Sequence, residues 1–200
     1  MKLYLNDASP YARLVRALLV ETGLDAETQM TFVDPWQSPN ELLVANPAAK
    51  VPALTLDDGI RLAESACIAD YLIMRSGRAA LAPLSPPSRA DAAKRLQILG
   101  LGRAAIDCSF GAVVQRRHAP GSPLIERWLQ ALPRIAEALD KLHAEGTPAD
   151  VDLADLTVAV AFEYVDFRLP EIQWRNEAPH LAARVAALGR RPSLATSRPR

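Results

Sequence analysis

The first part of the chain mixes two spacings of apolar residues. Short runs of alternating or apolar residues predict strands, and stretches with apolar residues three and four apart predict helices. In chain order the elements read strand, helix, strand, helix, strand, strand, helix. A strand–helix–strand opening implies a parallel pair with a right-handed crossover, and the closing hairpin adds antiparallel strands, so we expect a small mixed sheet with helices on both faces. The predicted strands are residues 2–5, 29–33, 53–56 and 60–62, and the predicted helices begin at Pro10, Asn40 and Ser65.

Beyond a stretch that contains three prolines, the pattern is helical throughout. Residues 90–114 and 123–142 read as long helices, and residues 156–169 are so apolar that we expect a central, buried helix there. Residues 179–188 form an amphipathic pattern. The sequence therefore predicts an α/β domain at residues 1–78, a linker at 79–88 and an all-helical domain at 89–200.

Composition narrows the possible partners. The 200 residues carry 23 basic and 23 acidic side chains, so nothing indicates a nucleic-acid footprint or a basic membrane patch. No apolar run reaches the roughly 20 residues of a membrane span, and the N-terminus leads directly into turn residues, unlike a signal peptide. Cys67 and Cys108 lack metal-ligand spacing and read as small core residues. We expect a cytoplasmic chain without a metal, a membrane or a nucleic acid as partner.

Val51-Pro52 stands immediately before the third predicted strand. Proline cannot donate a hydrogen bond to a sheet, and it forces the preceding residue into an extended conformation. The N–H and carbonyl of Val51 are then free to pair with something outside the sheet. An ordinary edge-strand proline is the alternative.

Ser9-Pro10-Tyr11-Ala12 lies where the first strand hands over to a helix. A glutaredoxin has Cys-Pro-Tyr-Cys in this place. Serine and alanine replace both thiols here, and dithiol exchange needs an attacking and a resolving thiol, so this site cannot perform that chemistry. Ser9 is either a plain N-cap or a hydroxyl that, with the helix N-terminus, favours an anion such as a bound thiolate.

Two further helix starts carry polar pairs. At Glu64-Ser65, the Ser65 hydroxyl and N–H suit a carboxylate and Glu64 suits an ammonium group, as in the head of an α-amino acid. An ordinary cap beside a solvated acid is the alternative. Asp152 and Asp155 precede a long apolar run at capping-box spacing, so we interpret them as caps and not as paired catalytic acids.

In this order and spacing, these segments resemble a glutathione S-transferase, in particular bacterial members with a serine at the active position. The resemblance covers nearly the whole chain. It implies a thioredoxin-like N-terminal domain, an all-helical C-terminal domain and a homodimer. Asn6-Asp7 departs from the Ser-Pro that is often seen before the active serine. The motifs are Ser9-Pro-Tyr-x-Arg13-x-x-Arg16, Asn46-Pro-x-x-Lys50-Val51-Pro52, Glu64-Ser65 with Tyr71-Leu72, Asp152-x-x-Asp155, and Arg191-Pro192-Ser193.

The resemblance also implies roles for individual residues. Ser9 is the implied catalytic hydrogen-bond donor, with Tyr11 as the alternative. Glutathione is the implied co-substrate, and Ser9, Trp36, Lys50, Val51, a cis-Pro52, Glu64 and Ser65 are its implied binding residues. The implied pocket for the second substrate, a small electrophile, lies between the domains and includes Tyr11, Arg103, Asp107 and Phe110.

The energetics allow thiol activation. A free thiol has a pKa of about 8.5. A hydrogen bond to a charged acceptor contributes roughly 1.5–3 kcal/mol and a helix terminus about 0.3–1 kcal/mol, which together lower the thiol pKa by about one to three units. The resemblance therefore implies an enzyme that adds glutathione to an electrophile. The alternatives are a glutathione-binding protein with little catalysis and a glutathione-dependent peroxidase or reductase.

Overall fold

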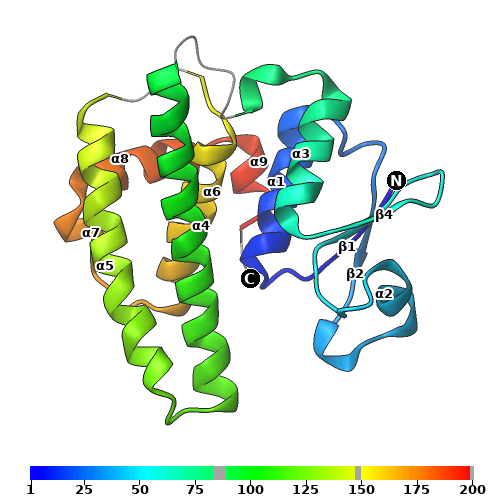
Figure 1. Ribbon diagram of the computed structural model, residues 1–200, viewed down its shortest axis with the longest axis horizontal. Helices are drawn as coiled ribbons and strands as arrows, with labels where there is room; N and C mark the ends of the chain where they lie inside the picture. The colour runs from blue at the N-terminus through cyan, green and yellow to red at the C-terminus, as the bar shows by residue number, and fades with distance from the viewer. Residues whose placement is uncertain (83–88, 147–149, 199–200) are drawn as a thin grey trace. The chain divides into compact units, whose positions relative to one another are not determined.

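The computed structural model describes residues 1–82, 89–146 and 150–198 (Figure 1). The chain divides into two compact units. The first contains Met1–Ala82 together with Pro192–Arg200, and the second contains Pro83–Arg191. Residues 83–88, most of the predicted linker, lie outside the described residues.

The first unit has the predicted order of strands and helices. The fourth strand is one residue later than expected, because Ile60 closes the hairpin by accepting the N–H of Leu56 at 2.8 Å. Two short 3-10 helices, η1 and η2, and the short helix α9 were not anticipated. The elements are β1 (Lys2–Leu5), α1 (Pro10–Thr22), β2 (Gln29–Phe32), η1 (Pro35–Gln37), α2 (Asn40–Ala45), β3 (Ala53–Thr55), β4 (Arg61–Ala63), α3 (Ser65–Ser76), η2 (Ala79–Leu81) and α9 (Pro192–Ala195).

The sheet has the strand order β2-β1-β3-β4, with β1 parallel to β2 and all other pairs antiparallel. Side chains alternate between the faces of a strand. Tyr4 packs with Leu42 and Ala45 of α2, whereas Leu3 and Leu5 are buried on the other face, where α1 and α3 lie side by side (Figure 1). The mixed sheet with helices on both faces is thus confirmed.

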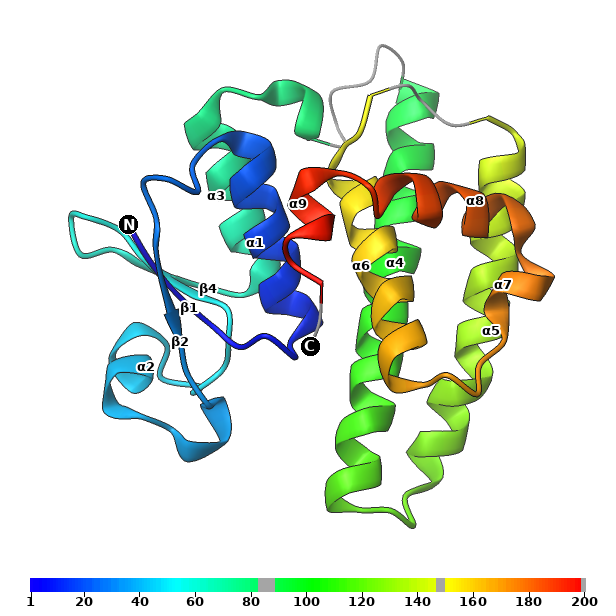
Figure 2. The ribbon, with the colours of Figure 1, turned by 180° about the vertical axis from the view of Figure 1, so that it is seen from behind.

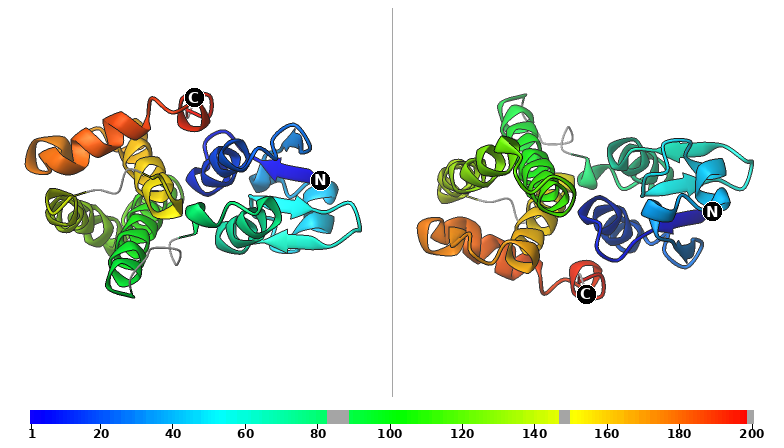
Figure 3. Two further views of the ribbon diagram at one scale, coloured as in Figure 1. Left: turned by 90° about the horizontal axis from the view of Figure 1, so that it is seen from above. Right: turned by 90° about the horizontal axis from the view of Figure 1, so that it is seen from below.

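The second unit is all-helical, as predicted. Helix α6 is buried along most of its length, α4 packs against α5 and α6, and α8 packs against the same two helices (Figure 3). Helices α4 and α5 approach closely at Gly111, where an added Cβ would lie 2.9 Å from the Trp128 ring. The helices are α4 (Arg89–His118), α5 (Pro123–Ala144), α6 (Leu153–Arg168), α7 (Trp174–Glu177) and α8 (Pro179–Leu188).

The last residues of the chain depart from the predicted boundary. Residues 89–200 were expected to form one helical domain, but Pro192–Arg200 groups with the first unit. The physical reason is that α9 buries Leu194 completely and packs against α1. A short basic segment with little periodicity carries no sequence signal for such a long-range contact.

The cysteines also differ in part from expectation. Cys67 is exposed on α3, so its assignment to the core was wrong, and Cys108 is half-buried. Both are free thiols. Loss of hydration on burial raises the pKa of the Cys108 thiol.

Among the described residues, one helix is long and apolar enough to pass a composition test for a membrane span: Asp91–His118 of α4. The core helix of a soluble protein passes the same test, and this helix packs against α5 and α6.

Candidate functional site

The register of the sheet brings four chain segments to one of its edges. Tyr4 lies opposite Ala53, and Ala53 lies opposite Ala63, so β1 and β4 end where β3 begins. Leu5 pairs with Phe32 in the parallel ladder, so β2 ends there as well. The connections that meet at this edge are residues 6–9, residues 33–39, residues 46–52 and Glu64-Ser65.

Ser9 is the N-cap of α1. Its backbone is extended (φ −88°, ψ 119°), its Oγ accepts the N–H of Ala12 at 3.2 Å, and Pro10 fills the first helical position. The residue is 8% exposed. The structure thus shows the capping role. In the described part of the chain the hydroxyl proton of Ser9 has no acceptor, so a hydrogen bond to a ligand is compatible with the cap.

The loop before Ser9 is held by Asn6, a residue that the sequence reasoning did not select for the site. The Asn6 Oδ1 accepts the N–H of Ala8 at 2.9 Å, and its Nδ2 donates to the carbonyl of Val33 at 3.2 Å. Its own carbonyl accepts the N–H of Ser9 at 3.2 Å. Asn6 therefore ties the end of β1 both to the connection after β2 and to the N-cap. Asparagine side chains often accept a hydrogen bond from the backbone N–H two residues later in a turn, and this preference is the sequence signal for the role of Asn6.

The peptide bond between Val51 and Pro52 is cis, as the resemblance implied. Asn46, 5% exposed, holds the loop that leads to it: Nδ2 donates to the carbonyl of Lys50 at 2.9 Å, and Oδ1 accepts the N–H of Ala48 at 3.1 Å. No described residue bonds to the N–H or carbonyl of Val51. The N–H and carbonyl of Val51 are thus available to a ligand at this edge of the sheet.

Glu64 and Ser65 form the start of α3. Glu64 has φ +67° and ψ 123°, a left-handed φ that is uncommon for a residue with a side chain and is often associated with functional sites. It makes no side-chain cap, and its carbonyl accepts the N–H of Ile68 at 3.0 Å. Ser65 is buried, yet within the described residues its hydroxyl bonds to nothing. The N-terminus of α3 therefore presents an uncommitted hydroxyl and unbonded backbone N–H groups.

Trp36 lies in the connection after β2. Its backbone N–H donates to Oδ1 of Asp34 at 3.0 Å at the start of η1, and the residue is 55% exposed. Lys50 is exposed in the neighbouring connection, and Tyr11 is half-buried on the first turn of α1. Trp36 and Lys50 thus belong to segments that meet at this edge of the sheet, and Tyr11 follows the segment 6–9 on the first turn of α1.

The remaining predicted residues, Arg103, Asp107 and Phe110, lie on α4 in the second unit. Their spacing of four and three places them on one face of that helix. Because the proposed second-substrate pocket combines them with Tyr11 of the first unit, it stays a prediction.

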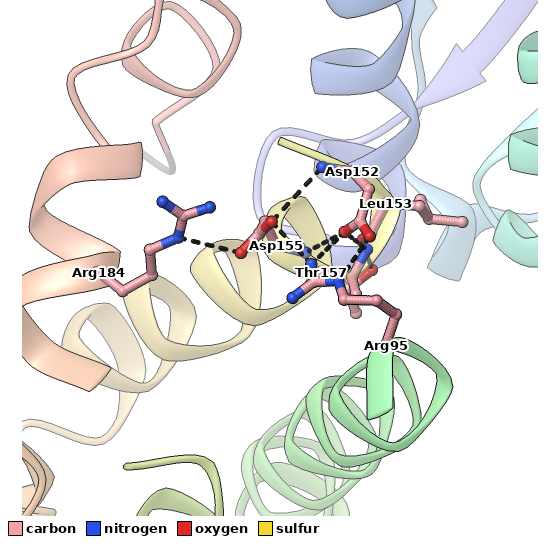
Figure 4. A network of polar contacts seen from close by, with 7 residues as sticks. Arg95, Asp152, Leu153, Asp155, Thr157 and Arg184 are labelled. Atoms are coloured by element: carbon pink, nitrogen blue, oxygen red, sulfur yellow. Dashed lines mark hydrogen bonds and ion pairs between the residues drawn. The ribbon is translucent and has the colours of Figure 1, made fainter. Parts of the chain in front are cut away.

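Asp152 and Asp155 cap α6, as predicted (Figure 4). Arg95 donates to Oδ2 of Asp152 and to Oδ2 of Asp155, both at 2.7 Å, and also contacts Oδ1 of Asp152. Arg184 donates to Oδ1 of Asp155 at 3.1 Å. Two arginines thus neutralise this buried pair, which serves the helix start and not acid–base chemistry. Among the described residues, no three or more His, Cys, Asp or Glu side chains gather as a metal site would require.

Two family models and several known proteins match this chain. Residues 8–73 match the family model of the glutathione S-transferase N-terminal domain, and residues 122–183 match that of the C-terminal domain. The uncharacterized GST-like protein YibF of Escherichia coli K12 is 28% identical, with 100% of this chain and 98% of the relative covered. The GST-like protein OpS6 of Beauveria bassiana is 30% identical, with 97% and 92% covered.

Solved structures are similar along their whole length. A glutathione transferase family member from Pseudomonas fluorescens Pf-5, with bound glutathione, has a TM-score of 0.84 and 31% identity, with 100% of this chain and 98% of that chain covered. A glutathione S-transferase from Methylobacillus flagellatus, also with glutathione bound, has a TM-score of 0.86 and 28% identity, with 100% and 99% covered. The family models, the relatives and the fold agree, and this chain belongs to the glutathione S-transferase family.

Proposed function

We propose that this protein is a glutathione transferase that activates the thiol of bound glutathione for attack on a small electrophile. The observation that carries the proposal is the meeting of three uncommitted groups at one sheet edge: the Ser9 hydroxyl proton, the Val51 main chain and the Ser65 hydroxyl. Glutathione bound in two similar structures supports it.

The N-terminus of α3 is the proposed seat of the γ-glutamyl end of glutathione. Its carboxylate would accept hydrogen bonds from the Ser65 hydroxyl and the first backbone N–H groups, where the helix dipole also favours an anion. The Glu64 carboxylate would accept from the ammonium group. Glu64 is the N-cap residue of α3, with a positive φ and no side-chain cap bond, so its carboxylate is not used in capping the helix.

The cysteinyl part is proposed to lie along Val51, exchanging backbone hydrogen bonds as an added antiparallel strand would. The glycyl carboxylate then lies toward Lys50 and Trp36, which supply a cation and an exposed indole at the same edge. With its two ends so held, the peptide directs its sulfur toward the start of α1.

Ser9 is the proposed activating group. Its hydroxyl donates to the thiolate while its Oγ continues to accept from Ala12, and the N-terminus of α1 adds favourable charge. The thiol proton passes to solvent and the thiolate sulfur forms a bond to the electrophilic carbon. The displaced electron pair departs with a leaving group or, in an addition, takes up a proton from solvent. The protein supplies no nucleophile of its own, because the serine only stabilises the one that glutathione carries.

Titration calorimetry with glutathione tests the binding site. Ser65→Ala and Glu64→Ala, singly and together, should weaken binding, by about tenfold or more for the loss of a hydrogen bond to a charged group. Ser76→Ala is the matched control, because Ser76 lies at the opposite end of α3 and donates to the carbonyl of Ile73. Unchanged affinity in the double variant would remove α3 from the proposed site.

Turnover separates the transferase from its alternatives. A panel of halogenated aromatics, epoxides, unsaturated carbonyls and peroxides should show thioether formation with the electrophiles. Formation of glutathione disulfide with peroxides alone would indicate a peroxidase or reductase. Tight binding with no turnover on any compound would indicate a glutathione-binding protein.

We also propose a homodimer working in the cytoplasm. The family resemblance motivates the dimer, and exposed apolar residues on the first unit, including Val44 at 58% exposure, support it. The two free cysteines fit a reducing compartment. Light scattering at micromolar concentration should give twice the chain mass, and a mass near 21.7 kDa would contradict the dimer.

A further inference from the structure

We propose that the C-terminal segment, residues 192–198, positions Ser9 for thiol activation by holding α1 and the loop before it. The inference rests on the proposed function, since it concerns the same catalytic group. It assigns a role to a segment that lies at the opposite end of the sequence from the site.

Two arginines on one face of α1 bind the main chain of the C-terminal segment. Arg13 donates to the carbonyl of Leu194 at 3.2 Å, and Arg16 donates to the carbonyl of Thr196 at 3.3 Å. Residues three apart lie on the same helix face, so both contacts fix one side of α1. Arg13 follows the N-cap Ser9 by a single helical turn.

The segment is anchored as a folded part of the first unit. Helix α9 lies beside α1 (Figure 2). Leu194 is fully buried, and the buried Ser193 hydroxyl donates to Oε1 of Glu21 at 2.5 Å. These contacts hold the far end of α1, whereas Arg13 and Arg16 hold its beginning.

Arg16 continues the connection into the loop that precedes Ser9. Its second terminal nitrogen lies 3.3 Å from Oδ1 of Asp7. Asp7 follows Asn6, whose carbonyl accepts the N–H of Ser9. One guanidinium thus joins the C-terminal segment to the loop that sets the Ser9 backbone, and its carbon also lies 5.9 Å from the centre of the Phe32 ring at the end of β2.

Such support matters because a hydrogen bond to a developing anion depends on fractions of an ångström in the donor position. Ser9 lies at a loop–helix junction, so a shift of the loop or of α1 moves its hydroxyl. Arg16 acts here as a positioning residue and not as a catalytic one.

The test compares the two ends of the Asp7–Arg16 bridge, Asp7→Ala and Arg16→Met, in the full-length protein. The readout is the pH titration of thiolate absorbance near 240 nm for bound glutathione, together with kcat and KM. A pure charge effect would move the thiol pKa in opposite directions, downward for Asp7→Ala and upward for Arg16→Met. If the bridge positions Ser9, the thiol pKa rises in both variants, by about 0.5 or more. The value of kcat then falls several-fold, while KM for glutathione is nearly unchanged.

Leu194→Ala tests the segment itself, because it loosens the anchor without touching the bridge, and we expect a rise in thiol pKa in the same direction. Arg75→Met is the control: it removes an exposed arginine from α3 that pairs with Glu27 at 3.1 Å, and it should leave the thiol pKa unchanged.

Opposite shifts in the two bridge variants, or no shift in them and in Leu194→Ala, would overturn the inference and leave the proposed function standing. Failure of the unaltered protein to bind glutathione would overturn the proposed function itself.

Discussion

Tyr4 and Ala53 lie opposite each other in the antiparallel pair of β1 and β3. This register places the connection after β1, which carries Ser9, beside the connection before β3, which carries Val51. A slip of one residue would turn Tyr4 toward α1 and Leu3 toward α2, so the side chains packed on the two covered faces of the sheet would be exchanged. The same pairing that buries the core side chains therefore brings the segments of the proposed site together.

Replacing Ser9 by alanine should affect both stability and the bound thiol. Loss of the N-cap bond to Ala12 should lower the free energy of unfolding by about 0.5–2 kcal/mol. Loss of the donor should raise the thiol pKa of bound glutathione by about 1 or more, while binding persists. Thiolate absorbance near 240 nm against pH measures the second effect.

Ser122→Ala is the matched control for this variant. Ser122 caps α5 in the same way, with its Oγ accepting the N–H of Leu124 at 3.3 Å, so its loss costs a cap in the second unit. It should leave the thiol titration unchanged. If Ser9→Ala also leaves the titration unchanged, Ser9 is only a cap and Tyr11 becomes the candidate.

Replacing Ser9 by cysteine should change the type of chemistry. A thiol at the N-terminus of α1 becomes more acidic and more reactive, and Ala12 offers no resolving thiol. On mild oxidation with glutathione disulfide, residue 9 should form a mixed disulfide and release one glutathione, and a second glutathione should then free it. Conjugating activity should fall as monothiol reductase activity appears.

Mass spectrometry locates the adduct of this variant. Cys67, which is exposed, is the internal comparison. An adduct on Cys67 with none on residue 9 would mean that Ser9 does not face the glutathione sulfur.

Removing the buried Arg95 should be strongly destabilising. Arg95→Met leaves the carboxylates of Asp152 and Asp155 without their main partner, which costs about 3–5 kcal/mol for a buried pair. The neighbouring variant Lys94→Met removes only an exposed ion pair with Glu145 and should cost about 0–1 kcal/mol. Urea unfolding, followed by circular dichroism of the helices, gives the free energy of unfolding of both variants. Equal losses of this free energy in the two variants would contradict the structural role of the Arg95 network.

His143 should make the second unit sensitive to acid. Loss of hydration on burial lowers the pKa of its imidazole, and its Nδ1 lies 2.7 Å from the carbonyl of Leu139. The nearby charges have smaller effects: Asp155 raises this pKa, and Arg184 and Arg95 lower it. Because the folded pKa lies below the unfolded value of about 6.5, the unfolded chain binds more protons at mildly acidic pH.

The contribution of neutral His143 to the free energy of unfolding is therefore fully present above about pH 6.5. It is lost as pH falls below that value, with a slope of at most about 1.4 kcal/mol per pH unit. The urea midpoint should fall less between pH 7.5 and pH 5.5 for His143→Leu than for the unaltered protein. Equal falls in both would show that His143 is not the group that responds.

Several parts of this protein are determined by local sequence. Apolar spacing predicted the strands and the longer helices of both units, because a helix or strand must present one face to the core. Ser9 and Asp152 were identified as caps, because a side-chain oxygen at a helix start bonds to N–H groups only two or three residues away. Such features need no knowledge of distant contacts.

Other parts appear only in the tertiary structure. The positive φ of Glu64, the ties that Asn6 and Asn46 make across their loops, and the pairing of Arg95 with Asp155 depend on surroundings that no short window contains. The contact of Arg13 with Leu194 joins residues 181 positions apart. Side-chain periodicity fixes which face of an element is buried, but not which distant segment covers it, and that is why the return of the C-terminal segment to α1 could not be predicted.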